Sequence, residues 1–174
     1  MKLAIIGSRG FPYVYSGYET FVSEVAPRLV ARGHEVTVHC FEELFEERPA
    51  MHRGVRLTYI GGSKRKSLTQ LSHSWRSVRH LLRLGGERPD VALFVNAANG
   101  LFGPILRACS VCAAINVDGL EWERPKWSGL GAKVFYVAAK MATRSFDLVI
   151  TDAFAMADVY RREFNADSTV IEYG

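Results

Sequence analysis

At the start of the sequence stands Leu-Ala-Ile-Ile-Gly (residues 3–7), a short apolar run that ends at a glycine. Such a run is typical of a parallel strand that is buried on both faces. After a long loop, apolar residues recur at spacings of three and four between Phe21 and Val30, which indicates the buried face of a helix. Gly33 is placed to end that helix, and Pro27 to kink it or to shorten its first turn. This strand–loop–helix unit predicts an α/β fold.

The same alternation continues along the chain. Further strands are predicted at residues 35–41, 55–60, 91–95, 111–117, 147–151 and 168–172, and helices near 68–82, 99–109, 127–146 and 154–164. Residues 42–53 are charged and are predicted to form a surface loop. About seven strands that alternate with helices give a doubly wound, Rossmann-like domain, with a mostly parallel sheet and helices on both faces. We expect residues 1–174 to form one such domain.

The composition excludes several classes of protein. Hydrophobic residues make up 48% and charged residues 23% of the 174, which is ordinary for a globular domain and excludes disordered, collagen-like and disulfide-scaffold chains. Three cysteines, an odd number, favour a reducing compartment, and no apolar run is long enough for a spanning helix. The protein is therefore expected to be cytoplasmic. The net charge of +4 favours anionic partners, among which nucleic acid, nucleotide sugars and membrane surfaces stay open.

Ligands of a doubly wound sheet bind beyond the carboxyl ends of its strands. The loops at these ends that are candidates for a binding site are residues 8–20, 96–100 and 118–127. The first of these loops lacks the dinucleotide fingerprint, because Arg9 stands where the second glycine belongs, and it lacks a Walker A sequence. A phosphate can instead bind to backbone amides where Gly17 precedes the helix, with Arg9 adding a bidentate contact. The alternative is that the glycines only shape a strand-to-helix turn.

The loop at residues 118–127 combines carboxylates with tryptophans, which suits sugar recognition through stacking and hydrogen bonds to hydroxyls. Asp118 leaves the strand first and is expected to point into the cleft. Arg124 and Lys126 either pair with the acidic residues or bind a phosphate. The alternative is that Glu121 and Glu123 cap the next helix and the tryptophans only pack, and for Glu123 we prefer this alternative.

Other motifs carry less information. The basic loop at residues 63–67 is typical of a solvated turn, and its functional interpretation is a contact with lipid head groups or a diphosphate. Cys109 and Cys112 have redox-motif spacing but straddle a helix end and a buried strand, which favours a structural role. The five histidines show no metal-ligand spacing, so no metal site is predicted. No cofactor is predicted either. Dispersed basic residues argue against a nucleic-acid partner.

Several segments together carry a resemblance to a known family. They are Ile-Gly-Ser-Arg-Gly-Phe-Pro (6–12), Ser-Gly-Tyr-Glu-Thr-Phe (16–21), Leu-Val-Ala-Arg-Gly-His-Glu-Val-Thr-Val (29–38) and Val-Asp-Gly-Leu-Glu-Trp (117–122), with shorter matches at 66–68, 72–74, 124–127 and 173–174. The chain resembles the N-terminal half of GT-B glycosyltransferases of the family 4 type. The most similar subgroup is that of bacterial rhamnosyltransferase-like enzymes of polysaccharide synthesis. The glycine loop together with residues 117–122 is the specific part of this resemblance.

The resemblance implies a retaining, metal-independent enzyme in which two Rossmann-like domains face a cleft. The N-terminal domain would mainly bind the acceptor, and a C-terminal domain would grip the nucleotide sugar. Asp118 matches a position near the transfer centre, and the loop at Gly17 one that approaches the donor diphosphate. We assign Asp118 to catalysis and the following residues to binding the donor diphosphate or the acceptor: Arg9, Gly10, Ser16, Gly17, Glu19, Thr20, Glu121, Trp122, Arg124 and Lys126.

The resemblance also implies the partners. The donor would be a dTDP- or UDP-sugar, with dTDP-rhamnose favoured by the subgroup. The acceptor would be a saccharide or a polyprenyl-diphosphate-linked saccharide, which would bring the protein into peripheral contact with the inner face of the membrane.

The chain departs from the family in one respect, because residues 1–174 contain no counterpart of the donor-binding domain. We therefore expect the chain alone to be inactive, and turnover of any nucleotide sugar by the isolated chain would contradict this. One alternative is a non-catalytic nucleotide- or phosphate-binding Rossmann-like module, which calorimetry with nucleotide sugars and acceptor analogues would distinguish. An NAD-dependent oxidoreductase is disfavoured by Arg9 at the second glycine position.

Overall fold

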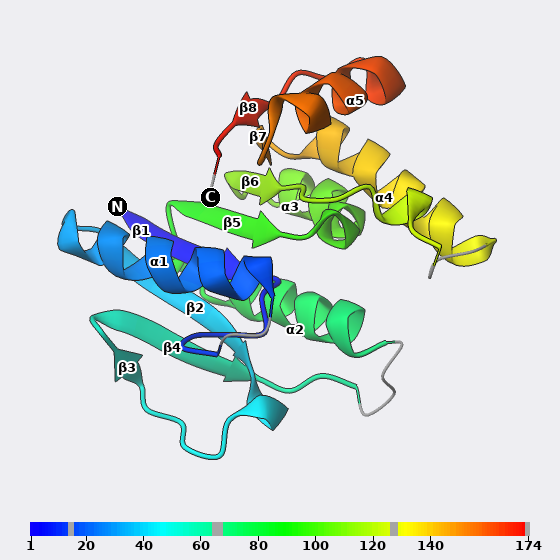
Figure 1. The fold of residues 1–174 in the computed structure, drawn as a ribbon. Coiled ribbons are helices and arrows are strands. Elements are labelled where there is room, and N and C mark those ends of the chain that lie inside the picture. Colours follow the sequence, from blue (N-terminus) through cyan, green and yellow to red (C-terminus); the bar gives the residue numbers. More distant parts are fainter. Residues whose placement is uncertain (14–15, 64–67, 126–128, 173–174) are drawn as a thin grey trace. The chain divides into compact units, whose positions relative to one another are not determined.

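A computed structural model describes residues 1–13, 16–63, 68–125 and 129–172 (Figure 1). The chain divides into two compact units, Met1–Leu93 and Phe94–Gly174. Each unit is built from strands that alternate with helices, as the sequence predicts. Within the described residues no helix combines the length and the apolar character needed to cross a membrane.

The first unit places helices on both faces of a small sheet (Figure 1). Its elements are β1 (Lys2–Ile6), α1 (Gly17–Ala31), β2 (Glu35–Phe41), η1 (Glu42–Leu44), β3 (Met51–His52), β4 (Val55–Ile60), α2 (Thr69–Arg83) and η2 (Gly85–Glu87). β2 pairs in parallel with both β1 and β4, whereas β3 pairs antiparallel with β4. In Figure 1, α1 and α2 lie on opposite faces of these strands.

The second unit is built around a close approach of two helical segments. Its elements are η3 (Ala97–Phe102), α3 (Gly103–Ala108), β6 (Ala113–Asn116), η4 (Glu121–Glu123), α4 (Leu130–Ser145), β7 (Leu148–Thr151), α5 (Phe154–Phe164) and β8 (Thr169–Val170). β6, β7 and β8 pair in parallel. Gly100 in η3 lies directly against the backbone of Ala138 in α4, because a Cβ atom on this glycine would lie 2.0 Å from the Ala138 carbonyl oxygen.

The strand order confirms the predicted α/β fold with a mostly parallel sheet. With β5 (Val91–Val95), which straddles the unit boundary, the order is β3-β4-β2-β1-β5-β6-β7-β8. Over the residues that the structure describes, this order contains eight strands, one more than predicted. The additional strand is β3, so the prediction that residues 42–53 form only a loop is wrong. β3 turns into β4 through Arg53 and Gly54, whose φ angles of 48° and 78° are those of a tight hairpin turn.

Two predictions about α1 had different outcomes. Pro27 does not shorten the first turn of the helix, because α1 runs from Gly17 to Ala31 with Pro27 inside it, and the alternative of a kink at Pro27 stays a prediction. Gly33 follows the end of the helix with a φ of 87°, and its amide donates to the carbonyl of Val30 at 2.9 Å. Only glycine adopts this backbone conformation at low cost, so the predicted stop signal is confirmed.

Candidate functional site

The loop after β1 is pressed against the neighbouring loop of the first unit. Gly10 has a φ of 130°, and a Cβ atom there would lie 2.8 Å from the Phe45 ring and 2.9 Å from Cys40 Cβ. Both the backbone angle and the lack of space therefore require glycine at this position. The side chain of Gln70, near the start of α2, donates to the carbonyl of Gly7 at 2.7 Å and holds the beginning of the loop.

Three of the predicted site residues meet around one buried carboxylate. Glu19, in the first turn of α1, is 3% exposed. Its Oε1 accepts from the backbone amide of Arg9 at 2.9 Å, and its Oε2 accepts from the hydroxyl of Ser16 at 2.5 Å. Ser16 and Glu19 have capping-box spacing, but the carboxylate reaches back to the β1 loop rather than to the N-cap amide. Glu19 therefore fixes the path of the loop that leads into α1.

Among the described residues, the side-chain position of Gly17 at the beginning of α1 faces open space. Gly17 is the first residue of the helix, and a Cβ atom there would meet no described atom within 4 Å. Thr20 donates to the carbonyl of Ser16 through its amide at 3.1 Å and through its hydroxyl at 3.2 Å. A helix N-terminus beside open space is a place where backbone amides can receive an anionic group.

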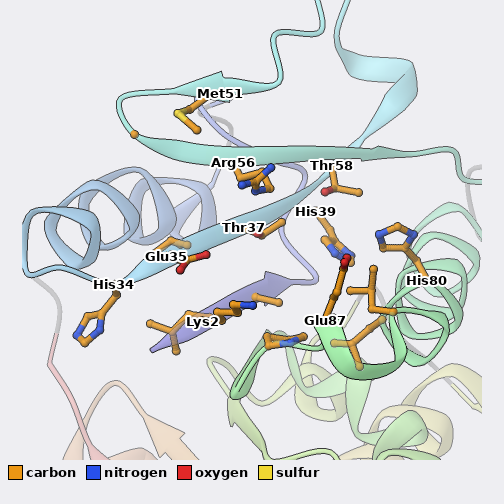
Figure 2. Close-up of a pocket in the computed structure, with 17 residues that line it drawn as sticks. Lys2, His34, Glu35, Thr37, His39, Met51, Arg56, Thr58, His80 and Glu87 are labelled. Atoms are coloured by element: carbon orange, nitrogen blue, oxygen red, sulfur yellow. The ribbon is translucent and has the colours of Figure 1, made fainter.

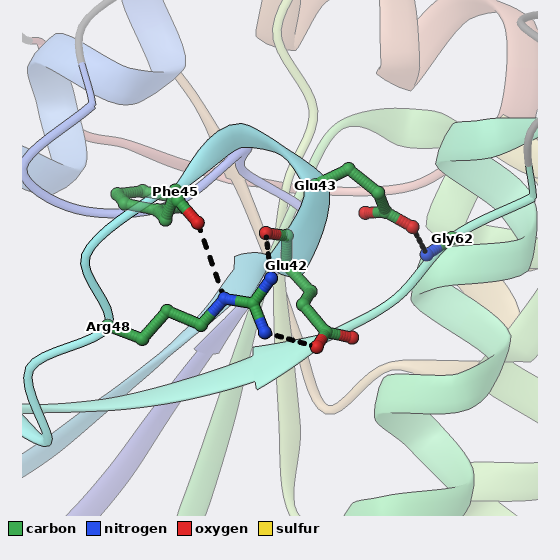
Figure 3. A network of polar contacts seen from close by, with 5 residues as sticks. All are labelled: Glu42, Glu43, Phe45, Arg48 and Gly62. Carbon is green, nitrogen blue, oxygen red and sulfur yellow. Dashed lines mark hydrogen bonds and ion pairs between the residues drawn. The ribbon is translucent and has the colours of Figure 1, made fainter.

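A polar network connects the loops after β2 and β4 (Figure 3), and its residues were not predicted to belong to the site. Arg48 forms an ion pair with Glu42 and donates to the carbonyl of Phe45 at 3.3 Å. Glu43 accepts from the backbone amide of Gly62, and Arg76 from α2 donates to the carbonyl of Gly61 at 2.8 Å. The mixed charges at residues 42–48, followed by Gly61-Gly62, were the available signal. This network orders the carboxyl-end loops of the first unit.

In the second unit, the predicted site residues follow β6. Asp118 lies just beyond the carboxyl end of the strand and is half-buried. Glu121 is 8% exposed, and its Oε1 lies 3.1 Å from Arg124 Nε. Arg124 was predicted either to pair with an acidic residue or to bind a phosphate, and in the structure it pairs with Glu121. Glu121 and Glu123 form η4, and α4 begins later, at Leu130. The alternative in which these two glutamates cap the next helix is therefore wrong.

Trp122 belongs to an aromatic cluster of the second unit. Its ring makes edge-to-face contacts with Tyr136 at 5.8 Å, Phe164 at 5.7 Å and Tyr160 at 6.2 Å between centroids. These contacts anchor η4 to α4 and α5 and give the half-buried Trp122 a packing role. A stacking role towards a sugar remains a prediction.

Two buried side-chain amides near the carboxyl ends of β5 and β6 have polar atoms without a hydrogen-bond partner among the described residues. Asn116, the last residue of β6, is 0% exposed, and neither its Oδ1 nor its Nδ2 has a hydrogen-bond partner among the described residues. Asn99 donates to the carbonyl of Val95 at 2.6 Å, but its Oδ1 has no partner within the same described set. Unpaired buried amides are rare in native proteins, so this place suits a polar ligand or water. Residues 96–100 were singled out from the sequence, whereas Asn116 was missed, although it is a polar residue in an apolar strand.

Some predicted features cannot be placed. Lys126, Trp127 and residues 64–67 of the basic loop lie outside the described residues.

Cys109 and Cys112 are both free thiols, at the end of α3 and just before β6. Within the described parts of the chain, no cluster of three His, Cys, Asp or Glu residues could hold a metal ion.

Comparisons with known proteins identify similar sequences and structures. A family model described as a glycosyl transferase 4-like domain matches residues 16–174. Sucrose-phosphate synthase from Thermosynechococcus elongatus superposes with a TM-score of 0.73 and 15% identity, covering 99% of this chain and 48% of that one. UGT2 from Phytolacca americana, complexed with UDP-2fluoro-glucose and pterostilbene, superposes with a TM-score of 0.60 and 12% identity, covering 99% of this chain and 54% of that one.

A third solved structure, Arabidopsis thaliana UGT89C1 complexed with UDP-L-rhamnose, has a TM-score of 0.60 and 12% identity, covering 99% of this chain and 48% of that one. The chain thus spans about half the length of these solved structures. At these identities the likeness establishes the fold alone. A search of curated proteins found no match.

Proposed function

The chain belongs to the glycosyl transferase 4-like domain family, and on this basis we propose that it forms the acceptor-binding half of a retaining glycosyltransferase. The single observation that carries this proposal is the family match over residues 16–174. The enzyme would transfer a sugar, with rhamnose favoured, from a dTDP- or UDP-sugar to a saccharide or polyprenyl-diphosphate-linked acceptor in polysaccharide synthesis. Because the chain spans about half of the structures it matches, we propose that a second domain grips the nucleotide and that residues 1–174 alone are inactive.

Two features of the first unit support an anionic donor at its carboxyl-end loops. The amino end of α1 opens onto free space at Gly17, and Glu19 fixes the preceding loop through Arg9 and Ser16. A preordered loop loses less entropy when it binds a diphosphate. Two of the superposed proteins were solved with UDP-sugars, which agrees with a nucleotide-sugar partner.

In the second unit we propose Asp118 as the catalytic residue. It lies two residues beyond Asn116, the last residue of β6, whose buried side-chain amide has no partner among the described residues. A carboxylate at a strand end, close in sequence to an unpaired amide, can hold sugar hydroxyls and stabilise positive charge that develops at the transferred carbon.

We also propose a peripheral membrane contact, for which α4 offers support. Leu130, Val134 and Val137 are 77%, 39% and 47% exposed along this helix, Lys133 and Lys140 are exposed as well, and α4 contains no acidic residue. Apolar and basic side chains on one helix suit an anionic lipid surface.

Replacing Gly17 by alanine is expected to separate function from folding. A methyl group fits the open space and favours helix, so the free energy of unfolding should rise by up to about 1 kcal/mol. If a donor diphosphate occupies this space, the KM for the nucleotide sugar should rise at least tenfold. Urea unfolding of the 174-residue chain and steady-state kinetics of the transferase that contains it measure the two effects.

Gly33→Ala is the matched control, because Gly33 also faces open space but has a φ of 87°. It should lower the free energy of unfolding by about 1 kcal/mol and leave the KM unchanged. An unchanged KM in Gly17→Ala would contradict a donor at this helix end. Binding of free nucleotides with no dependence on the sugar or the acceptor would favour the non-catalytic module instead.

Asp118→Asn is expected to lower kcat of the transferase at least about 100-fold, because it removes the charge and keeps the side-chain shape. The circular dichroism spectrum and the melting temperature should stay close to those of the unmodified protein. Glu123→Gln, an exposed position of the same segment, is the control and should leave kcat unchanged. A normal kcat in Asp118→Asn would exclude a catalytic role.

A further inference from the structure

Over residues 36–39 of β2 and 55–58 of β4, the sheet of the first unit has one apolar and one polar face. The residues of the apolar face, at most 6% exposed, are Val36, Val38, Val55 and Leu57. The alternate residues, which point to the other face, are Thr37, His39, Arg56 and Thr58. In the register of the two strands, Thr37 lies beside Arg56, and His39 lies beside Thr58. Parallel strands are normally apolar on both faces, so these four polar residues call for a physical reason.

A cavity of about 470 Å³ lies over this polar face (Figure 2). Residues from β1, β2, β4, the end of α2 and η2 line it, and all of them belong to the first unit. Lys2 and Glu35, which line the cavity, are the first residues of β1 and β2. The cavity therefore lies at the amino ends of the strands, whereas the loops of the proposed transferase function lie at their carboxyl ends. Its volume is typical of a small-molecule site.

His39 is the deepest polar group of the cavity wall. It is 2% exposed, and its Nδ1 has no hydrogen-bond partner among the described residues. Its ring lies 5.5 Å from the ring of His80, and Figure 2 shows both at one end of the cavity. Burial, with a smaller contribution from His80 and His73, lowers the pKa of His39 to about 3. The ring is therefore neutral at neutral pH and offers a hydrogen bond without attracting an anion.

The charges around the cavity balance. Lys2 and Arg56 are basic, Glu35 and Glu87 are acidic, and none of the four forms an ion pair with another described residue. Two positive and two negative groups produce no net field that would concentrate phosphate. Together they supply both donors and acceptors, which a ligand rich in hydroxyl groups can use.

We propose that this cavity binds an uncharged monosaccharide or disaccharide. The hydroxyls of Thr37 and Thr58, the imidazole of His39 and the guanidinium of Arg56 would bond to sugar hydroxyls, and the half-buried side chain of Leu84 would pack against C–H groups. The binding site is separate from the carboxyl-end loops and does not depend on the proposed transferase function.

Amide chemical shifts of the ¹⁵N-labelled 174-residue chain provide the test. The probes are D-glucose, L-rhamnose and maltose, with inorganic phosphate as the anionic probe and UDP as the probe of the carboxyl-end loops. We expect the saccharides to shift residues 37–39 and 56–58 in a saturable way with a millimolar dissociation constant. UDP should shift residues 7–20 instead, so a failure of the transferase proposal and a failure of this one are distinguishable.

Matched variants assign the binding to the cavity. The double variant Thr37→Val, Thr58→Val removes two hydroxyls without changing shape or strand preference, and it should weaken saccharide binding at least fivefold. Arg56→Gln, at an exposed position that cannot unfold the core, should weaken it as well. Thr169→Val makes the same change on β8, outside the cavity, and should have no effect.

Three results would overturn the proposal. The first is the absence of shifts at residues 37–39 and 56–58 at 100 mM (about a hundred times a millimolar dissociation constant) of every saccharide. The second is saccharide binding of unchanged strength in the double variant and in Arg56→Gln. The third is a larger response of these residues to phosphate than to any of the sugars, which would make the cavity an anion site.

Discussion

Replacing Gly100 by alanine is expected to destabilise the protein by about 4 kcal/mol. A Cβ atom at this position would lie 2.0 Å from the carbonyl oxygen of Ala138, 2.9 Å from its carbonyl carbon and 3.0 Å from Ala142 Cβ. Two of these atoms belong to the backbone of α4, so no side-chain rotation can relieve the overlap. Either η3 or the whole of α4 must move, and this movement disrupts the packing of the second unit.

Urea unfolding followed by circular dichroism measures this loss, and Gly86→Ala is the control. A Cβ atom on Gly86 would meet no described atom within 4 Å, so this variant should unfold within about 0.5 kcal/mol of the unmodified chain. Accumulation of Gly100→Ala in inclusion bodies, while Gly86→Ala stays soluble, would agree with the prediction. A loss of less than 1 kcal/mol (below the usual cost of overpacking a core) would show that η3 and α4 do not approach this closely.

Local patterns were enough to predict most of the elements. The predicted strands at residues 35–41, 55–60 and 91–95 and the helix at 154–164 have the same bounds in the structure. In these segments the periodicity of apolar residues and the secondary structure agree over five residues or more. β3 was missed because its two residues, Met51 and His52, are too few to show alternation. Only the Arg53-Gly54 turn pointed to it, more weakly than an Asn-Gly pair would.

The candidate site was predictable as a set of loops but not as a set of contacts. Arg9, Ser16 and Glu19 were assigned to one binding loop, yet the structure shows that the carboxylate of Glu19 bonds to the other two residues. Gly10 lies against Phe45, and Gly100 against Ala138, across separations of more than thirty residues that no local pattern records. Asn116 is different, because a polar residue at the end of an apolar strand is visible in the sequence and could have been singled out.

Mild acid is expected to weaken the first unit through two buried histidines. His39 is 2% exposed and His73 is 0% exposed. Burial, and to a smaller degree the nearby His80 and His73, lowers the pKa of His39 to about 3. Burial also lowers the pKa of His73 to about 4, where the Cys40 backbone and Glu43 oppose the effect and Arg76 adds to it. In the unfolded chain both pKa values are near the ordinary value of about 6.5.

The sign of the effect follows from proton binding. As the pH falls through 6.5, the unfolded chain binds protons at both histidines, whereas the folded chain does not until the pH approaches 4 and then 3. Proton binding therefore lowers the free energy of the unfolded state relative to that of the folded state throughout this window, and the protein loses stability. Between pH 7 and pH 5 the loss is about 2 kcal/mol for each histidine, and about 4 kcal/mol for the pair.

Urea unfolding at pH 7, 6 and 5 tests this expectation, with the single variants His39→Gln and His73→Gln as the comparison. Each variant lowers stability at pH 7 by its own packing cost, but it should remove about half of the histidine-linked fall between pH 7 and pH 5, because it lacks one of the two groups that bind a proton on unfolding. The double variant should remove nearly all of that fall. If the fall between pH 7 and pH 5 has the same size in all four proteins, His39 and His73 are not the groups that link protonation to unfolding.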